Sequence, residues 1–328
     1  MNRFATRELS MLVALVAIWA FFAWQEPVFL SARNLSLLSV ELAITAVLAL
    51  GMLVVLLPGQ IDLSAGSGVG LAGAVAAVLV FWHDMPAPIA LLIATLGAVL
   101  VWSAMGALIA VERIPAFIMT LGGLLVFRGL HWLVIENQTV PVVVGGSQNV
   151  YSQLTTYYLP DVGGYVLAGL AVAAIAASTL AARKRRQSHG FPVDDGEITF
   201  LKLFALAQMV FLVVIVTNGY RGVPIALVIL GLVAVLVHQL VTNTPFGRYL
   251  YAVGGNEEAA VVSGVPVRNT IIGAYALMGG IVALSGFMQT AYSGASTSTV
   301  GSLMELDAVA ACVIGGTSLR GGRGTVLG

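Results

Sequence analysis

The sequence predicts an all-α protein, a polytopic bundle of transmembrane helices. Three observations lead to this fold class: 59% of the 328 residues are hydrophobic, only 9% are charged, and the apolar residues fall in long runs separated by charges. Soluble domains carry about 25% charged residues, so this chain has too few charges for a water-exposed surface. Lipid is the solvent that this composition favours. It excludes a disordered chain, a nucleic-acid-binding domain and most soluble enzymes.

Charged residues mark the ends of the expected spans, because one charge at mid-membrane costs about 2.5–3.5 kcal/mol on insertion scales. The apolar residues do not alternate with a period of two, which favours helices over a barrel. Most runs are close to the roughly 20 residues that a helix needs to cross hydrocarbon. Nine spans and the beginning of a tenth are expected, at Leu9–Gln25, Leu42–Ile61, Leu63–His83, Met85–Val111, Ile114–Ile135, Val162–Ala182, Leu203–Tyr220, Gly222–Gly247, Asn269–Met304 and Ala308–Ile314.

Positive charges orient these spans, because loops on the cytoplasmic side of a membrane carry an excess of Lys and Arg. If the N-terminus is cytoplasmic, ten basic residues lie inside, namely Arg3, Arg7, Arg113, the cluster Arg183–Arg186, Lys202, Arg248 and Arg268. Only Arg33 and Arg221 then lie outside. We therefore expect a cytoplasmic N-terminus and an uncleaved first helix, since no small-residue cleavage site follows it.

The alternation divides residues 1–328, expected to be a single permease domain, into spans and loops. Residues 136–164 form the expected exterior loop, and residues 183–202 and 242–270 form the expected cytoplasmic loops. The chain stops at Gly328, just after a glycine-rich turn that should lead into another element. We therefore expect that C-terminal helices are missing and that the chain is truncated.

Sequence patterns that resemble nucleotide-binding, metal-binding or catalytic motifs are better explained here by helix packing or by chance. Gly68-Val-Gly-Leu-Ala-Gly73 has the spelling of a dinucleotide-binding loop, but no strand precedes it and no acidic residue follows at the expected distance. Small residues such as Gly66 and Gly70 instead allow close helix packing. The single cysteine and the four scattered histidines have no metal-ligand spacing. We expect no catalytic residue, no metal and no cofactor. Ser293-Gly-Ala-Ser296 resembles an intramembrane protease loop, with His131 or His238 as its base, and this interpretation is much weaker.

Gly59-Gln60-Ile61-Asp62-Leu63-Ser64 interrupts two apolar runs and has two interpretations. A break that contains a carboxylate suits a discontinuous helix lining a polar cavity. The alternative, which we favour, is a turn at the cytoplasmic surface in which Asp62 caps the next helix. Glu41, Arg128, Glu305 and Asp307 are candidates for ion pairs or substrate contacts within the membrane.

The segment 244–266 predicts a short helix on the cytoplasmic side. Asn256 can cap it, and Glu257 and Glu258 are favourable at its positive end. Ala259 and Ala260 continue the helix, Gly264 ends it, and Pro266 prevents its continuation. Such a helix is suited to docking in the groove of a partner protein.

Residues 258–264, together with several other segments of the chain, resemble a known family of membrane proteins. Glu258-Ala259-Ala260 followed by Gly264 resembles the coupling motif of ABC importer permeases. Gly59–Ser64, Phe246–Asn256 and Glu305–Leu319 are similar to the branch of these permeases that transports ribose, xylose and galactosides. The xylose-transporting members are the most similar at Ser31–Asn34, Phe127–Gly129, Tyr220–Pro224 and the basic insert after Ala182.

The resemblance implies a membrane subunit of an ATP-driven sugar importer in a bacterial inner membrane. Two copies would form the path, a periplasmic binding protein would deliver the sugar, and a separate ATPase would dock on residues 256–264. Sugar contacts would come from the polar side chains Gln60, Asp62, Arg128, Gln289 and Tyr292. The competing hypothesis is an ion-coupled secondary transporter, in which Glu41, Asp62 and the Glu305/Asp307 pair would form a proton relay.

Overall fold

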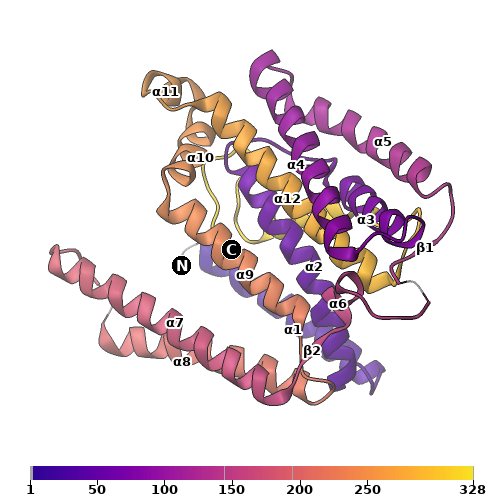
Figure 1. Ribbon diagram of the computed structural model, residues 1–328. Coiled ribbons are helices and arrows are strands. Elements are labelled where there is room, and N and C mark those ends of the chain that lie inside the picture. Colours follow the sequence, from indigo (N-terminus) through magenta and orange to yellow (C-terminus); the bar gives the residue numbers. More distant parts are fainter. Residues whose placement is uncertain (1–2, 144, 194, 328) are drawn as a thin grey trace. The chain divides into compact units, whose positions relative to one another are not determined.

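The computed structural model describes residues 3–143, 145–193 and 195–327, with the side chains of the first helix from Val13 onward (Figure 1). Its internal contacts divide the chain into two compact units. Unit 1 contains the residues up to Ser39 together with Tyr158–Pro224, and unit 2 contains Val40–Tyr157 together with Ile225–Gly328.

Helices form at all nine expected spans, but the ninth, expected at Asn269–Met304, ends at Ser293. A further helix begins at Met304, four residues before the expected start of the tenth at Ala308. The long helices are α1 (Arg3–Gln25), α2 (Ala32–Leu56), α3 (Ala65–Phe81), α4 (Ala87–Glu112), α5 (Ala116–Val134), α7 (Asp161–Ser188), α8 (Gly196–Asn218), α9 (Ile225–Asn243) and α12 (Val267–Ser293), with α13 at Met304–Ile314. In the described part of the chain, seven helices are long and apolar enough to cross a membrane. Two shorter apolar helices are α3 and the part of α1 with described side chains, Val13–Gln25. The expected polytopic helical bundle is confirmed.

Short elements fill the connections. The short helices are α6 (Val150–Thr156), α10 (Pro245–Gly255) and α11 (Glu257–Val262). Two-residue strands pair antiparallel, β1 (Val140–Pro141) with β4 (Ala295–Ser296) and β2 (Tyr158–Leu159) with β3 (Val223–Pro224).

In unit 1, α7 and α8 pack against each other and extend beyond the charge-free runs. The basic residues Arg185 and Arg186 lie in the last turn of α7, where the negative end of the helix dipole favours cations. Most of the expected loop 183–202 is therefore helical, and the connection is confined to residues 189–195. The charged residues predict the limits of the membrane-spanning part of each helix, but both helices continue beyond those limits.

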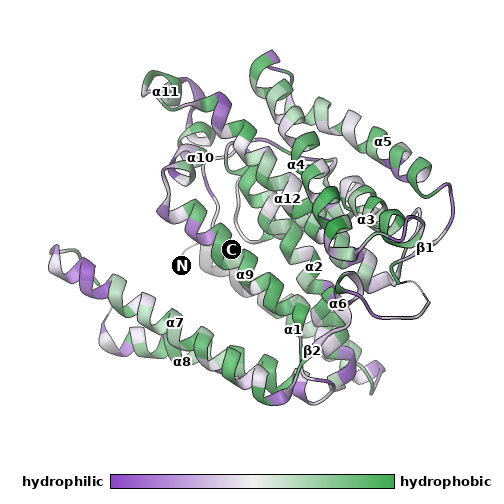
Figure 2. Ribbon diagram, in the orientation of Figure 1, coloured by the Kyte–Doolittle hydropathy of each residue, from purple (hydrophilic) through white to green (hydrophobic). Residues whose placement is uncertain are grey.

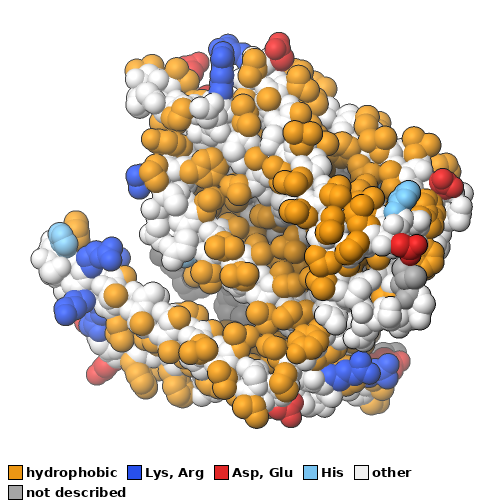
Figure 3. Space-filling model, viewed as in Figure 1, with side chains coloured by type: hydrophobic (Ala, Val, Ile, Leu, Met, Phe, Trp, Pro, Cys, Tyr) orange, Lys and Arg blue, Asp and Glu red, His pale blue; other side chains and the backbone are white. Residues whose placement is uncertain are grey.

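Hydrophobic side chains remain on the outside of these helices. In the most apolar 18-residue stretch of each helix, only 6% of the residues of α7 and 11% of those of α8 are buried. Nearly the whole circumference of both helices is therefore apolar and exposed, which suits contact with lipid. Figure 2 shows the apolar middle and polar ends of α7. In Figure 3, hydrophobic side chains cover much of the visible face, while charged ones lie mainly toward its edges.

In unit 2, α12 packs along α4 and α3 (Figure 1). Glycine permits this approach: a Cβ on Gly279 would lie 2.7 Å from the Ala98 carbonyl oxygen and 2.8 Å from the Trp102 Cβ. A Cβ on Gly66 or Gly70 would likewise overlap the backbone of segment 300–305. The packing interpretation of these glycines is confirmed.

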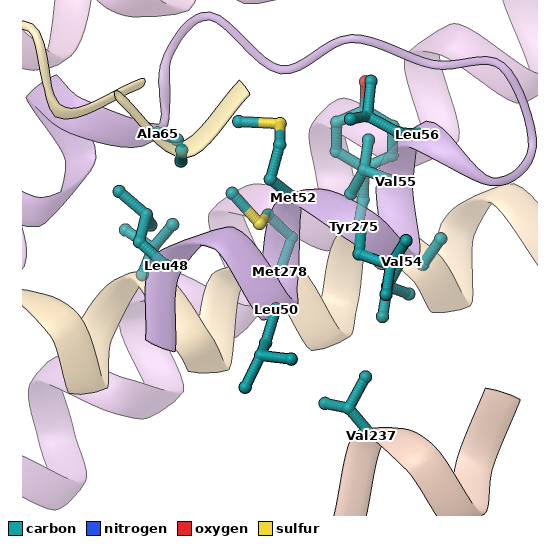
Figure 4. Close-up of a cluster of buried hydrophobic side chains, with 14 of the residues drawn as sticks. Leu48, Leu50, Met52, Val54, Val55, Leu56, Ala65, Val237, Tyr275 and Met278 are labelled. Atoms are coloured by element: carbon teal, nitrogen blue, oxygen red, sulfur yellow. The ribbon is translucent and has the colours of Figure 1, made fainter. Parts of the chain in front are cut away.

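The core of unit 2 is built from α2 and α12, and α9 and α3 contribute to it. Figure 4 shows Leu48, Met52 and Leu56 of α2 near Tyr275 and Met278 of α12. These side chains belong to one cluster of buried hydrophobic residues.

The expected exterior loop 136–164 is more ordered than its composition predicts. Asn149 begins α6 with a reciprocal capping box: its side chain accepts from the Ser152 amide, and Ser152 Oγ accepts from the Asn149 amide. The buried Tyr151 hydroxyl donates to the Gly73 carbonyl oxygen at 2.8 Å. This aromatic anchor fixes α6 on α3.

Candidate functional site

The short helix expected at residues 256–264 is confirmed as α11. The Asn256 side chain accepts a hydrogen bond from the Ala259 amide at 2.9 Å. At the other end Gly264 has a φ of +79°, a left-handed conformation that glycine adopts without strain. The Gly264 amide donates to Val261 and the Val265 amide donates to Ala260, the two bonds of a Schellman motif.

α11 exposes most of its surface. It packs on α10 and the start of α12, and Ala260 is its buried residue. Glu257, Glu258 and Ala259 are exposed. Val261 is 58% exposed and Val262 is 89% exposed. α11 lies next to α10 at one end of unit 2 (Figure 1). Its two exposed valines and two exposed carboxylates are chemically suited to docking in a groove.

The second site is the break between α2 and α3, residues 57–64, which we call the buried break. α2 ends in another Schellman motif, with Gly59 at φ +81°. The Gly59 amide donates to the Leu56 carbonyl oxygen, and the Gln60 amide donates to the Val55 carbonyl oxygen. Residues 60–64 form no regular structure before α3 begins, and the Thr120 hydroxyl of α5 donates to the Ile61 carbonyl oxygen at 3.1 Å.

Asp62 is fully buried in this break and accepts three hydrogen bonds. The Ser64 amide and hydroxyl donate to Oδ1 at 2.8 and 2.6 Å, and the Trp102 indole of α4 donates to Oδ2 at 2.7 Å. The favoured expectation of a surface turn capped by Asp62 is wrong. Ser64 occupies the N-cap position, and α4 covers the carboxylate with Trp102.

Aromatic packing closes the site around Asp62. The Trp102 ring lies 4.9 Å from that of Phe127 on α5, measured between centroids. A Cβ on Gly68 would overlap the indole, so α3 approaches Trp102 at a glycine. The buried break therefore joins α2, α3, α4 and α5 through one carboxylate and one indole.

The expected sugar-contacting residues do not form a single cluster. Trp102, which binds Asp62, packs against Gly279, and Gln289 lies ten residues further along α12, about 15 Å away along the axis. Tyr292 is near the end of the same helix, whereas Gln60 lies half-buried in the break. Arg128 is exposed on α5, close enough to Glu305 of α13 for an electrostatic interaction between the two side chains.

The residues of the protease hypothesis do come together. His131 Nε2 lies 3.3 Å from Ser296 Oγ, and both residues are buried. This contact links α5 to β4, and burial leaves no room for a peptide at the hydroxyl. Within the described residues, no three His, Cys, Asp or Glu side chains are placed to hold a metal ion.

Sequence reasoning missed the partners of Asp62. Trp102 lies 40 residues away, and Thr120 lies 59 residues from the Ile61 carbonyl that it binds. No local pattern predicts either contact. The one available signal was the carboxylate itself, because a buried charge must find hydrogen-bond donors.

Comparison with known proteins identifies the family. The family described as branched-chain amino acid transport system / permease component matches residues 34–328. The xylose transport system permease protein of Escherichia coli (strain K12) is 38% identical over 319 residues, which are 97% of this chain and 80% of that protein. The protein of the same description from Haemophilus influenzae is 38% identical over 322 residues, 97% of this chain and 84% of its own.

A galactoside relative extends the comparison. The galactose/methyl galactoside import permease protein of Escherichia coli (strain K12) is 31% identical over 334 residues, covering 98% of this chain and 82% of that protein. No solved structure matches the chain significantly. The family match spans most of the chain, and the seven apolar helices agree with it. The chain therefore belongs to this family of transport permeases and is a multi-pass membrane component of the ABC sugar import type.

Proposed function

We propose that this chain is the membrane-spanning permease subunit of an ATP-driven importer for D-xylose or a related monosaccharide. The observation that carries the proposal is the identity to the two xylose permeases, which is higher than that to the galactoside permease and covers nearly the whole chain. In this proposal the N-terminus is cytoplasmic, and a periplasmic binding protein delivers the sugar to the opposite side.

ATP hydrolysis belongs to a separate subunit that docks on α11. The exposed Val261 and Val262 would enter an apolar groove of that ATPase, and Glu257 and Glu258 would lie at the rim. An exposed helix suits docking because the ATPase can bind it without disturbing the packed core of the permease. Closure of the ATPase would then pull or push α11 and switch the permease between outward and inward access.

The exposed face of α5 supports a path between two copies of the chain. An arginine within a membrane-spanning helix costs about 2.5–3.5 kcal/mol when it faces lipid. Arg128 is exposed on α5, so this face is better suited to a water-filled path shared with a second copy. We retain Gln60, Gln289 and Tyr292 as candidate sugar contacts, and assign Asp62 to holding the buried break.

Uptake by reconstituted vesicles tests the proposal. The chain would be combined with the ATPase and sugar-binding protein from its genetic neighbourhood and supplied with labelled pentoses and hexoses. We expect ATP-dependent uptake of xylose above that of ribose and galactose. Uptake that continues without ATP but requires a proton or sodium gradient would instead support the ion-coupled alternative.

A further inference from the structure

Three backbone segments that are distant in sequence meet at one point of unit 2. They are Leu57–Gly59 after α2, Gly254 in the last turn of α10, and Gly321–Gly322 after α13. The Gly322 amide donates to the Leu57 carbonyl oxygen at 2.9 Å. We call this contact the glycine joint.

The joint leaves no room for a side chain at Gly254. A Cβ there would overlap the Leu57 carbonyl oxygen and the Gly322 amide nitrogen. A Cβ on Gly321 would lie 2.7 Å from the Gly59 amide nitrogen. Every atom in the way belongs to the backbone, so a rotamer change cannot relieve the overlap.

A hydrogen bond from α10 supports the joint from the side. The Tyr251 hydroxyl, one turn before Gly254, donates to the Gly324 carbonyl oxygen at 2.7 Å. Burial raises the pKa of Tyr251 further above its ordinary value, and the phenol is a neutral donor at physiological pH with or without that shift. α10 therefore holds the segment after α13 by both its backbone and a side chain.

The joint lies between the two sites already described. On one side, α10 carries α11 directly and is itself anchored by the buried Leu250 and Val253. On the other side, the buried break begins at Leu57. Further along it, Thr120 of α5 donates to the Ile61 carbonyl oxygen and Trp102 of α4 donates to the Asp62 carboxylate. A displacement of α10 therefore has a continuous route to α4 and α5, through backbone contacts as far as the buried break and through side-chain hydrogen bonds beyond it.

We propose that Gly254 is a positioning residue for transport, and that the glycine joint transmits movement of α10 and α11 to the buried break and from there to α5. This inference rests on the proposed docking of an ATPase on α11. Backbone contacts suit transmission because close-packed interiors are barely compressible and pass displacement on. A side chain inserted at Gly254 would wedge α10 away from Leu57 and break that transmission.

Two neighbouring glycines give a matched pair of variants. Gly254→Ala places its Cβ in the joint, whereas a Cβ on Gly255 would meet nothing within 4 Å. Both lie at the end of α10, so they share the change in helix propensity. Each variant would be reconstituted with the ATPase and binding protein, and three quantities measured: ATPase binding, ATP hydrolysis and sugar uptake per ATP hydrolysed.

We expect Gly254→Ala to bind the ATPase and hydrolyse ATP but to lose sugar uptake per ATP by about 5- to 150-fold, the usual range of coupling between sites. Gly255→Ala should stay within about twofold of the unmodified chain, a difference too small to count as coupling. Equal uptake per ATP in the two variants would overturn the proposal. Failure of the docking proposal is distinguishable from failure of the joint. Docking on α11 is tested by whether substitutions in α11 reduce ATPase binding, whereas Gly254→Ala is expected to keep that binding and lose only uptake per ATP.

A second variant covers the case in which Gly254→Ala does not assemble. Tyr251→Phe removes the hydrogen bond to Gly324 without adding an atom to the joint. We expect it to assemble normally and to lower uptake per ATP by about fivefold, the lower end of that coupling range. Unchanged uptake per ATP in Tyr251→Phe would then count against the joint as a transmission element.

Discussion

Asp62 illustrates how one charged residue can organise an apolar protein. A carboxylate removed from water is costly unless donors replace the lost hydration. Ser64 and Trp102 supply three donors, and the indole comes from a different helix. The buried break is thereby fixed in a single conformation, because any other arrangement would leave the carboxylate unpaired.

Replacing either partner should therefore destabilise the protein. We expect Asp62→Asn and Trp102→Phe each to lower the free energy of unfolding by about 1–3 kcal/mol, the cost of leaving a buried polar group unsatisfied. The double variant should be less damaging than the sum, with a coupling of about 0.5–3 kcal/mol. Thermal unfolding in detergent measures these differences.

An exposed indole provides the control for that cycle. Trp132 on α5 is 57% exposed, so Trp132→Phe makes the same chemical change outside the core. It should leave the unfolding midpoint almost unchanged. Strict additivity of Asp62→Asn and Trp102→Phe would show that the indole and carboxylate do not depend on each other.

At the scale of single residues, sequence reasoning was reliable where the contact is local. Asn256 and Gly264 were predicted as the ends of a short helix, and both bond to residues within five positions along the chain. Asp62 was recognised as unusual, but its role was predicted wrongly. Its decisive partner, Trp102, is brought to it by the fold alone.

Among the elements, α11 is the clearest case of a structure encoded in its own residues. An N-cap, six helical residues and a left-handed glycine set its two ends, and the buried Ala260 holds it on the rest of unit 2. Its exposure is a finding of the tertiary structure, in which five of its six side chains, Val261 and Val262 included, are exposed. Such an element is free to serve a partner.

A charge placed on α11 should disrupt that partnership. Val262→Asp would put a carboxylate where the proposed ATPase groove is apolar, and we expect at least about a tenfold loss of ATPase binding, as for a well-placed contact residue. Asn269→Asp adds the same charge at an exposed position early in α12 and serves as the control. Pull-down of the ATPase from detergent measures both.

The outcome that contradicts docking on α11 is equally specific. If Val262→Asp and Asn269→Asp retain the ATPase to the same extent, the partner binds elsewhere. Thermal unfolding of both variants would be measured first. The exposed position of Val262 predicts that its substitution leaves the fold intact.

Across the whole molecule, the few charged residues predict how the chain is oriented in the membrane. The basic residues expected on one side outnumber those on the other by ten to two, a bias typical of an N-terminus in the cytoplasm. Helices form where the spans are expected. Which end faces the cytoplasm stays a prediction.

Labelling from the two sides of the membrane tests that orientation. Cys312→Ser removes the single cysteine and keeps a donor for the Ala49 carbonyl oxygen. In that background, Gln138→Cys should react with an impermeant maleimide on intact cells, and Ser188→Cys only in inverted vesicles. Both positions are exposed, so the reverse pattern would invert the predicted topology.

The sequence by itself determined the membrane bundle, the approximate spans, the short helix α11 and the resemblance to sugar permeases. These properties depend on composition, on runs of apolar residues and on caps, all of which are local. The tertiary structure decided that Trp102 covers Asp62 and that Gly254 meets Leu57 and Gly322. The contacts among these residues join segments far apart in the chain. Packing selects such contacts through shape and hydrogen bonding, and neither can be read from one segment alone.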